Sequence, residues 1–136
     1  MLKSVGLAKE VSVNVINKIG VLADMAKLLT DNKVNIEAVA GYGKDNTGEA
    51  EIKMVTNDNV KAVAVLKKNN YTAVKEKDVL MVELTNKPGA LKVITEKIAS
   101  GGIDIRYIYG TACSGGCPAK IVLSTTNDTE ALSLLK

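Results

Sequence analysis

The sequence contains no histidine, no tryptophan and no phenylalanine, and Arg106 is its only arginine. Without histidine it lacks the commonest general base and the commonest metal ligand, which excludes His-based catalytic triads. Nearly all of the positive charge comes from lysine, which lacks the planar, bidentate grip of arginine. The formal net charge of +3 therefore indicates a solvated surface and argues against nucleic-acid binding.

Long apolar runs are also missing, and cysteine is scarce. No segment approaches the roughly 18 apolar residues of a membrane span, and residues 1–10 lack the apolar stretch of a signal peptide. We therefore expect a cytoplasmic protein without membrane contact, cofactor or resident metal. Cys113 and Cys117 are expected to be free thiols. The alternatives are a disulfide across this CxxxC loop or, with a second chain, a four-cysteine zinc site.

The most informative feature that is present is an internal repeat. Asn17–Leu22 returns as Asn86–Leu91, which sets the repeat offset at 86 − 17 = 69. The Thr-Asn-Asp triplets that begin at residues 56 and 126 fit an offset of 70, which predicts a one-residue insertion nearby. The repeat offset also aligns residues of matching type: Val13 with Val82, Val15 with Leu84, Met25 with Ile94, Leu29 with Ile98, and Gly41 with Gly110.

The repeat predicts two small domains, residues 9–77 and residues 78–136, which we call copy 1 and copy 2. Alternating apolar residues predict strands, and apolar residues at helical spacing predict helices. The fold class is α+β: two tandem ferredoxin-like βαββαβ units, each an antiparallel sheet with both helices on one face. The expected strands are residues 11–15, 34–42, 50–56, 71–76, 79–85, 103–112 and 119–125, and the second helices are residues 59–69 and 128–136.

Copy 2 ends with its second helix and lacks a fourth strand of its own. At the repeat offset, residues 2–5 fall on residues 71–74, the fourth strand of copy 1. An added strand satisfies a row of unpaired backbone groups at a sheet edge. We therefore expect residues 2–7 to serve as the fourth strand of copy 2, from the same chain or from a partner.

Two motifs carry a resemblance to a known family. Asn-Lys-Pro-Gly-Ala-Leu at 86–91, followed by Gly-Gly-Ile-Asp-Ile at 101–105, resembles the ACT domain, and Asn17–Gly20 is similar. The resemblance covers nearly the whole chain and implies a non-catalytic regulatory module that senses amino acids or other small metabolites. Because no residues remain for an attached enzyme or DNA-binding domain, it implies a free-standing pair. Copy 1 departs from the pattern at Ile19, where the family favours proline.

The candidate ligand site lies where each first strand meets its helix. A helix N-terminus presents unpaired N–H groups and partial positive charge, which suits a carboxylate, and glycine allows close approach to the backbone. The resemblance implies a facing wall from the start of a neighbouring domain's second strand. The candidate binding residues are Asn17, Lys18, Ile19, Gly20, Val21, Leu22, Asn86, Lys87, Pro88, Gly89, Ala90 and Leu91, with Asn35, Ile36, Asp104 and Ile105 on the facing wall.

A simpler interpretation of the same loops stays open. Asn17 and Asn86 are then ordinary helix N-caps and the glycines are turn residues. On either interpretation, Pro88 is expected in the first turn of its helix, where proline is tolerated.

The sequence thus predicts a small-molecule-binding regulatory protein, with an amino acid or a similar carboxylate as ligand. We expect a homodimer formed through exposed sheet edges, and a target enzyme or regulator as a further partner. One alternative is a protein-interaction module with degenerate sites. An acylphosphatase-like enzyme is a second alternative, but Lys18 stands in the loop that needs an arginine. Tyr107 and Tyr109 share a strand face and either stack RNA bases or fill an interface.

Overall fold

The structure, a computed structural model, describes all residues 1–136 and divides into two compact units. One unit is Lys9–Lys77, which is copy 1, and the other combines Met1–Ala8 with Asp78–Lys136, which is copy 2. Strand β1 (Leu2–Ile16) contributes its first residues to copy 2 and the rest to copy 1. Strand β4 (Ala73–Leu84) likewise begins in copy 1 and ends in copy 2.

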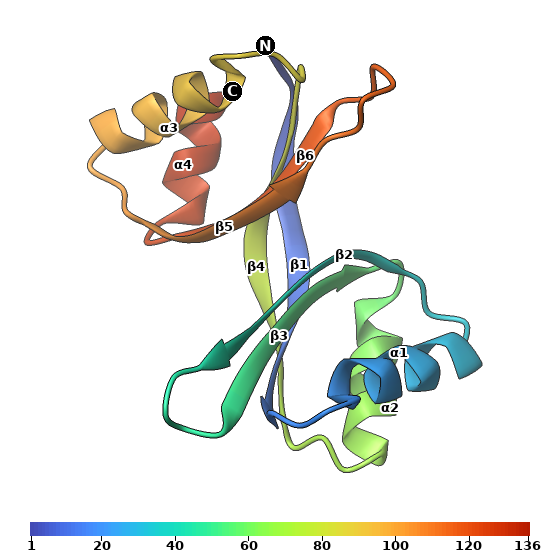
Figure 1. The fold of residues 1–136 in the computed structure, drawn as a ribbon. Coiled ribbons are helices and arrows are strands. Elements are labelled where there is room, and N and C mark those ends of the chain that lie inside the picture. Colours follow the sequence, from blue (N-terminus) through green and yellow to red (C-terminus); the bar gives the residue numbers. More distant parts are fainter. The chain divides into compact units, whose positions relative to one another are not determined.

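Copy 1 is built as a β-α-β-β-α-β unit. After β1 come α1 (Val21–Asp31), β2 (Ile36–Lys44), β3 (Glu49–Thr56) and α2 (Asn59–Lys68), and the chain then enters β4. The strands are ordered β2-β3-β1-β4, and the β1–β3 and β2–β3 pairs are antiparallel. Figure 1 shows α1 and α2 packed side by side against this sheet.

The core of copy 1 follows from the period of its apolar residues. Alternate residues of β1 point to one face of the sheet, and Val11 and Val13 are fully buried there. Residues four apart on α1, Met25 and Leu29, meet them and are also fully buried. Leu66 of α2 completes this cluster, so both helices cover the same face.

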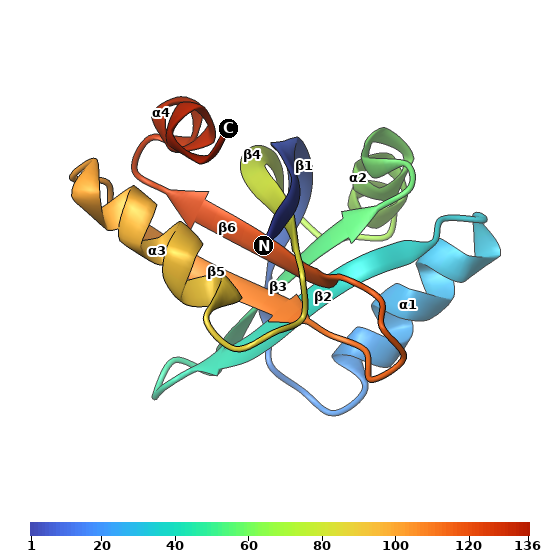
Figure 2. The same ribbon diagram turned by 90° about the horizontal axis from the view of Figure 1, so that it is seen from above.

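Copy 2 has the same architecture. After the second part of β4 come α3 (Ala90–Ser100), β5 (Ile105–Thr111), β6 (Ala119–Thr125) and α4 (Asp128–Leu135). Its strands are ordered β1-β4-β6-β5, with antiparallel β4–β6 and β5–β6 pairs. Both helices lie on the same side of β5 (Figure 1), and Figure 2 shows the same elements from above. The two ferredoxin-like units, with helices on one face, are the fold class that the sequence predicts.

The first residues of the chain form part of copy 2. Leu2 and Val5 pack against its hydrophobic core. The Thr85 amide, just after β4, donates a hydrogen bond to the Met1 carbonyl at 2.7 Å. Because β1 is the neighbour of β4 in the strand order, residues 2–8 occupy the position of a fourth strand.

Three helices end in the same hydrogen-bonded motif. After α1, the Lys33 amide donates a hydrogen bond to the Thr30 carbonyl, and the Val34 amide donates one to the Leu29 carbonyl. Lys33 itself lies in the left-handed region, at φ 60°. This is a Schellman motif. The same pair of bonds closes α3 at Gly102 (φ 71°) and α2 at Asn70 (φ 73°). After the first helix of each copy, the left-handed residue is therefore a lysine in copy 1 and a glycine in copy 2.

The second helices correct one detail of the predicted repeat. Asp58 caps α2 by accepting from the Lys61 amide, and Asn127 caps α4 by accepting from the Glu130 amide, each at 3.1 Å. These two caps stand at the same offset as the loops (127 − 58 = 69), so the predicted insertion does not exist. The Thr-Asn-Asp triplets are out of register because aspartate and asparagine cap a helix equally well.

None of the helices α1 to α4 has the length and apolar character that a membrane-spanning helix requires.

Candidate functional site

The loop between β1 and α1 in copy 1 is a tight turn that ends at the helix. The Val21 amide donates to the Lys18 carbonyl at 3.3 Å, and Gly20 adopts φ 87° and ψ 1°. These are the features of a type II turn, which needs a positive φ at its third residue. The first bond of the helix follows, from the Asp24 amide to the Gly20 carbonyl at 2.9 Å.

The equivalent loop of copy 2 has the same geometry. The Ala90 amide donates to the Lys87 carbonyl at 3.2 Å, and Gly89 adopts φ 89° and ψ −13°. Pro88 therefore occupies the second position of a type II turn, which proline favours. It precedes the helix, so the prediction that it lies in the first helical turn is wrong. Ile19 takes the same position in copy 1, because the turn requires glycine only at its third residue.

Neither asparagine of these loops caps its helix, so that half of the simpler interpretation is wrong, whereas Gly20 and Gly89 are turn residues as it expects. The residues that precede α1 and α3 are Gly20 and Gly89, and no side chain caps either helix. The turn sets Asn17 and Asn86 three residues further back. The backbone amide of Asn17 instead donates to the Gly48 carbonyl at 2.9 Å. The side-chain amide of Asn86 donates to the Cys113 carbonyl at 3.1 Å.

The predicted facing wall lies away from the loop of its own copy. Asn35 and Ile36 follow the C-terminal end of α1, whereas the loop precedes its N-terminal end. Eleven helical residues separate the two ends by about 16 Å. The Asn57 amide donates to the Asn35 carbonyl, and the Asn35 amide donates to the side-chain oxygen of Asn57. In copy 2 the Thr126 amide donates to the Asp104 carbonyl, and the Asp104 amide donates to the Thr126 hydroxyl. Within one copy these residues therefore anchor strand ends and do not join the loop.

A cavity of about 380 Å³ opens beside the copy 1 loop, which we call the copy 1 cavity. The end of β1, the start of α1 and the turn between α2 and β4 form its walls. This volume is at the small end of the range of ligand pockets in proteins. Its lining residues are residues 14–16, Lys18, Val21, Asp24 and residues 69–72.

Sequence reasoning predicted two of these lining residues, Lys18 and Val21, and missed the others. The far wall belongs to residues 69–72, which lie at least 48 residues beyond the loop in the sequence (69 − 21 = 48). The Schellman motif fixes this wall, because the Tyr71 amide donates to the Leu66 carbonyl at 3.1 Å. The predicted fold could have revealed this wall, because in it the end of β1 and the start of its neighbour β4 lie side by side.

Tyr71 and Asp24 join two walls of the copy 1 cavity. The Tyr71 hydroxyl donates a hydrogen bond to Oδ2 of Asp24. Burial of the phenol, followed by this hydrogen bond and the charge of Asp24, raises the pKa of Tyr71 to about 12. The phenol is therefore neutral at physiological pH and acts as the donor.

The family can now be assigned. A model of the ACT domain pair matches residues 7–134. The chain belongs to the ACT domain pair family. The resemblance found in the sequence is thereby confirmed, and the paired loops, Asn17–Leu22 and Asn86–Leu91, are those of two ACT domains. ACT domains are regulatory modules and not catalytic ones.

Several solved structures resemble this ACT domain pair. Protein BT0572 from Bacteroides thetaiotaomicron is 25% identical, with a TM-score of 0.87, over 96% of this chain and 88% of its own. The regulatory subunits of aspartate kinase from Thermus thermophilus, in a ligand-free form, and from Thermus flavus are each 11% identical. Their TM-scores are 0.67 and 0.62, over 98% of this chain and 95% of theirs. At that identity the likeness shows the fold alone. No curated protein matches the sequence.

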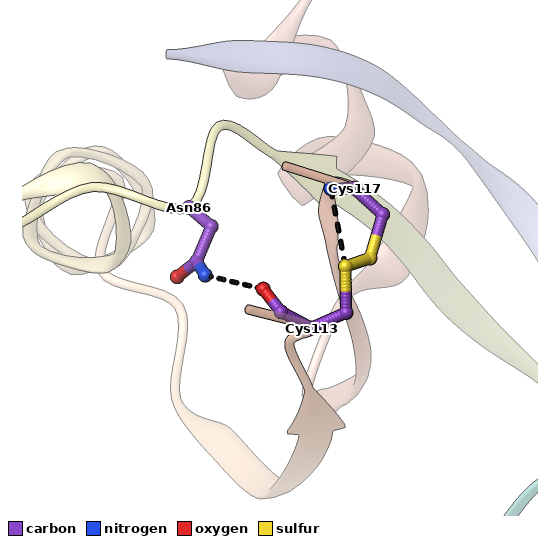
Figure 3. The surroundings of a disulfide bond; sticks show 3 residues. All are labelled: Asn86, Cys113 and Cys117. Carbon is purple, nitrogen blue, oxygen red and sulfur yellow. Dashed lines mark hydrogen bonds between the residues drawn. A yellow bond between two sulfur atoms is a disulfide. The ribbon is translucent and has the colours of Figure 1, made fainter. Parts of the chain in front are cut away.

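The two cysteines lie next to the copy 2 loop. In the structure Cys113 and Cys117 form a disulfide, so the prediction of free thiols is wrong. The turn between β5 and β6 brings their Cα atoms to 5.7 Å, a normal separation for a bridge. Figure 3 shows the Asn86 side chain directed at the Cys113 carbonyl. No group of three or more His, Cys, Asp or Glu side chains could hold a metal ion.

A buried polar cluster occupies the sheet of copy 1. Glu51 on β3 accepts a hydrogen bond from the Ser12 hydroxyl and pairs with Lys53 at 3.5 Å and with Lys44 at 3.3 Å. Burial raises the pKa of Glu51, but the Ser12 hydrogen bond and the two lysines outweigh it, so that the pKa is lowered from 4.5. The cluster is internally satisfied and gives no sign of a ligand.

Proposed function

We propose that this ACT domain pair is a regulatory sensor that binds an amino acid or a similar small carboxylate at its strand-to-helix loops. The observation that carries the proposal is the copy 1 cavity, which lies at the loop predicted from the sequence and is of amino-acid size. The family supports a regulatory role. Binding of the ligand changes the stability or the assembly of the pair, and the chain itself catalyses no reaction.

The helix starts supply the physical basis for carboxylate binding. An α-helix leaves its first amides without intrahelical acceptors. In α1 the first such bond begins at Asp24, so the amides of Leu22 and Ala23 precede it. Together with the helix dipole they favour an anion. Gly20 adds open space, since a Cβ built there meets no atom within 4 Å.

The proposed partners follow from the same role. A sensor without catalytic groups acts on something else, and a target enzyme or regulator is the simplest partner. The similar aspartate kinase of Clostridium acetobutylicum is described as allosteric, and this chain matches 34% of its length. We also propose a homodimer, formed by pairing of exposed strand edges such as β2 or β5. Sedimentation at micromolar concentration tests this, and a monomer contradicts it.

Thermal melting with each of the twenty L-amino acids tests the proposed function. A ligand at a hundredfold excess over its Kd stabilises the protein by about 2.7 kcal/mol. Gly20→Val and Gly89→Val place a branched side chain over the loop amides, and each is expected to remove the shift contributed by its own copy. Both variants strain a positive φ, so retained folding is checked by circular dichroism. If no amino acid or carboxylate shifts the melting temperature, the assignment is wrong.

A further inference from the structure

The charged groups that line the copy 1 cavity are of opposite sign. Lys18 lies on the turn before α1, and Asp24 lies in the first turn of the helix. Lysine and the helix start both favour an anion. A carboxylate in the same cavity favours a cation. A small ligand that carries both charges on neighbouring atoms, an α-amino acid zwitterion, matches this arrangement, whereas a simple carboxylic acid or a simple amine matches half of it.

The carboxylate of Asp24 is oriented by the opposite wall. It accepts a hydrogen bond from the Tyr71 hydroxyl through one of its oxygens, Oδ2. A carboxylate has about four acceptor positions on its two oxygens, so this bond leaves capacity for a second donor. Tyr71 is fixed in turn by the hydrogen bond from its amide to the Leu66 carbonyl and by the left-handed Asn70 before it. The acidic group is thus held in place before any ligand arrives.

Copy 2 lacks this pair. At the repeat offset, Val93 replaces Asp24 and Leu2 replaces Tyr71. Leu2 packs against the core of copy 2. A Cβ on Gly89 would lie 3.9 Å from Cε of Met1, so an apolar side chain approaches this loop. The copy 2 loop therefore keeps Lys87 but offers no carboxylate for an ammonium group.

We propose that the copy 1 cavity binds an α-amino acid as a zwitterion, with Asp24 receiving the ammonium group and Lys18 the carboxylate. Tyr71 is a positioning residue that orients Asp24. The proposal rests on the proposed amino-acid-binding function and adds that copy 1, and not copy 2, recognises the ligand's charges.

Calorimetric titration of the whole chain with each of the twenty L-amino acids identifies the tightest ligand for the test. That amino acid is then compared with its des-amino carboxylic acid. Asp24→Asn keeps the size of the side chain and removes its charge. We expect it to weaken the amino acid at least about tenfold, the usual weight of a charged hydrogen bond, and to leave the des-amino acid within about twofold. Tyr71→Phe is expected to give a smaller loss of the same kind.

Two matched controls separate recognition from structure. Asp31→Asn makes the same charge change in α1, at a residue paired with Lys27 and outside the cavity, and is expected to change nothing. Lys18→Gln is expected to weaken both the amino acid and the des-amino acid, whereas Lys87→Gln, its counterpart in copy 2, leaves both unchanged. In a nitrogen–proton correlation spectrum, the ligand is expected to shift the amides of residues 69–72 more than those of 86–91.

The possible results are distinguishable. If an amino acid binds and Asp24→Asn weakens it no more than it weakens the des-amino acid, the ammonium assignment is overturned and the sensor function stands. The same conclusion follows if Lys87→Gln, and not Lys18→Gln, impairs binding. If no amino acid binds the wild-type chain, this inference fails, and the proposed function fails with it only if no other small carboxylate binds either.

Discussion

Gly110 offers a stringent test of the structure, because its copy 1 counterpart is its control. It lies on β5 opposite Ile121 of β6. An alanine Cβ at Gly110 would lie 2.5 Å from the Lys120 carbonyl oxygen, 2.5 Å from Cδ1 of Ile121 and 3.2 Å from its Cα. A side-chain rotation relieves only the contact with Cδ1. The other two involve backbone atoms, so Gly110→Ala forces the two strands apart.

The counterpart is Gly41, which lies on β2 opposite Ile52. A Cβ there would meet Cγ1 of Ile52 at 3.8 Å and the Glu51 carbonyl oxygen at 3.9 Å, which are ordinary van der Waals distances. Neither Gly41 nor Gly110 has a positive φ. Gly41→Ala is therefore expected to be neutral, or to stabilise by up to about 1 kcal/mol through a less flexible unfolded chain.

The expected cost of Gly110→Ala is that of overpacking, about 1–3 kcal/mol. Urea unfolding measures it as a lower midpoint at an unchanged slope. Amide hydrogen exchange then locates the effect. Protection from exchange is expected to decrease in β5 and β6 and to stay unchanged in β2 and β3. If Gly110→Ala unfolds at the wild-type midpoint, or Gly41→Ala loses as much, the strand contact described here is wrong.

Two further predictions concern the shared strand and the buried cluster. Deleting residues 1–8 removes a strand and two apolar side chains from copy 2, which is expected to lower the free energy of unfolding by an amount on the order of 2–5 kcal/mol. The deletion is also expected to speed amide exchange in residues 78–84. Fast amide exchange throughout residues 2–7 of the intact chain would contradict this prediction. The lowered pKa of Glu51 means that its contribution to stability is complete above pH 4.5 and is lost as pH falls through the lowered value. Glu51→Gln is therefore expected to lose less stability than wild type between pH 5 and pH 3 in urea titrations, and an unchanged pH slope would show that the cluster does not hold the charge.

Secondary structure was predictable here because the apolar periods are strong and occur twice. The alternation in β1 at Val11, Val13 and Val15 and the helical spacing of Met25 and Leu29 each have a counterpart at the repeat offset. Burial of these residues makes a shift of register costly, since one residue turns every side chain to the other face. The predicted helices and strands therefore agree with the structure to within a few residues, except that residues 2–7 and 11–15 form one continuous strand, as do residues 71–76 and 79–85.

Turn geometry was less predictable, because several turns use the same residues. Asn-Lys-Pro-Gly before a helix fits an asparagine cap with proline in the first turn, and it fits a type II turn that ends at a glycine. The φ of 89° at Gly89 decides between them. Composition does not give that angle. The disulfide was only an alternative to free thiols for a similar reason, because the CxxxC spacing does not reveal that the turn brings Cys113 and Cys117 together.

The copy 1 cavity lies where the two copies differ, which explains why the internal repeat does not reveal it. A fixed repeat offset detects positions that both copies must keep, and these are the buried residues of the sheets and helices. The hydrogen-bonded pair of Asp24 and Tyr71, which we propose to serve a ligand in copy 1, has no reason to recur. Asp24 aligns with Val93, and Tyr71 aligns with Leu2, which comes from the other end of the chain. Because copy 2 takes residues 2–8 as its fourth strand, the position equivalent to Tyr71 carries an apolar side chain that packs on the core. Sharing of the terminal strand therefore also explains why copy 2 has no counterpart of the Tyr71 hydroxyl.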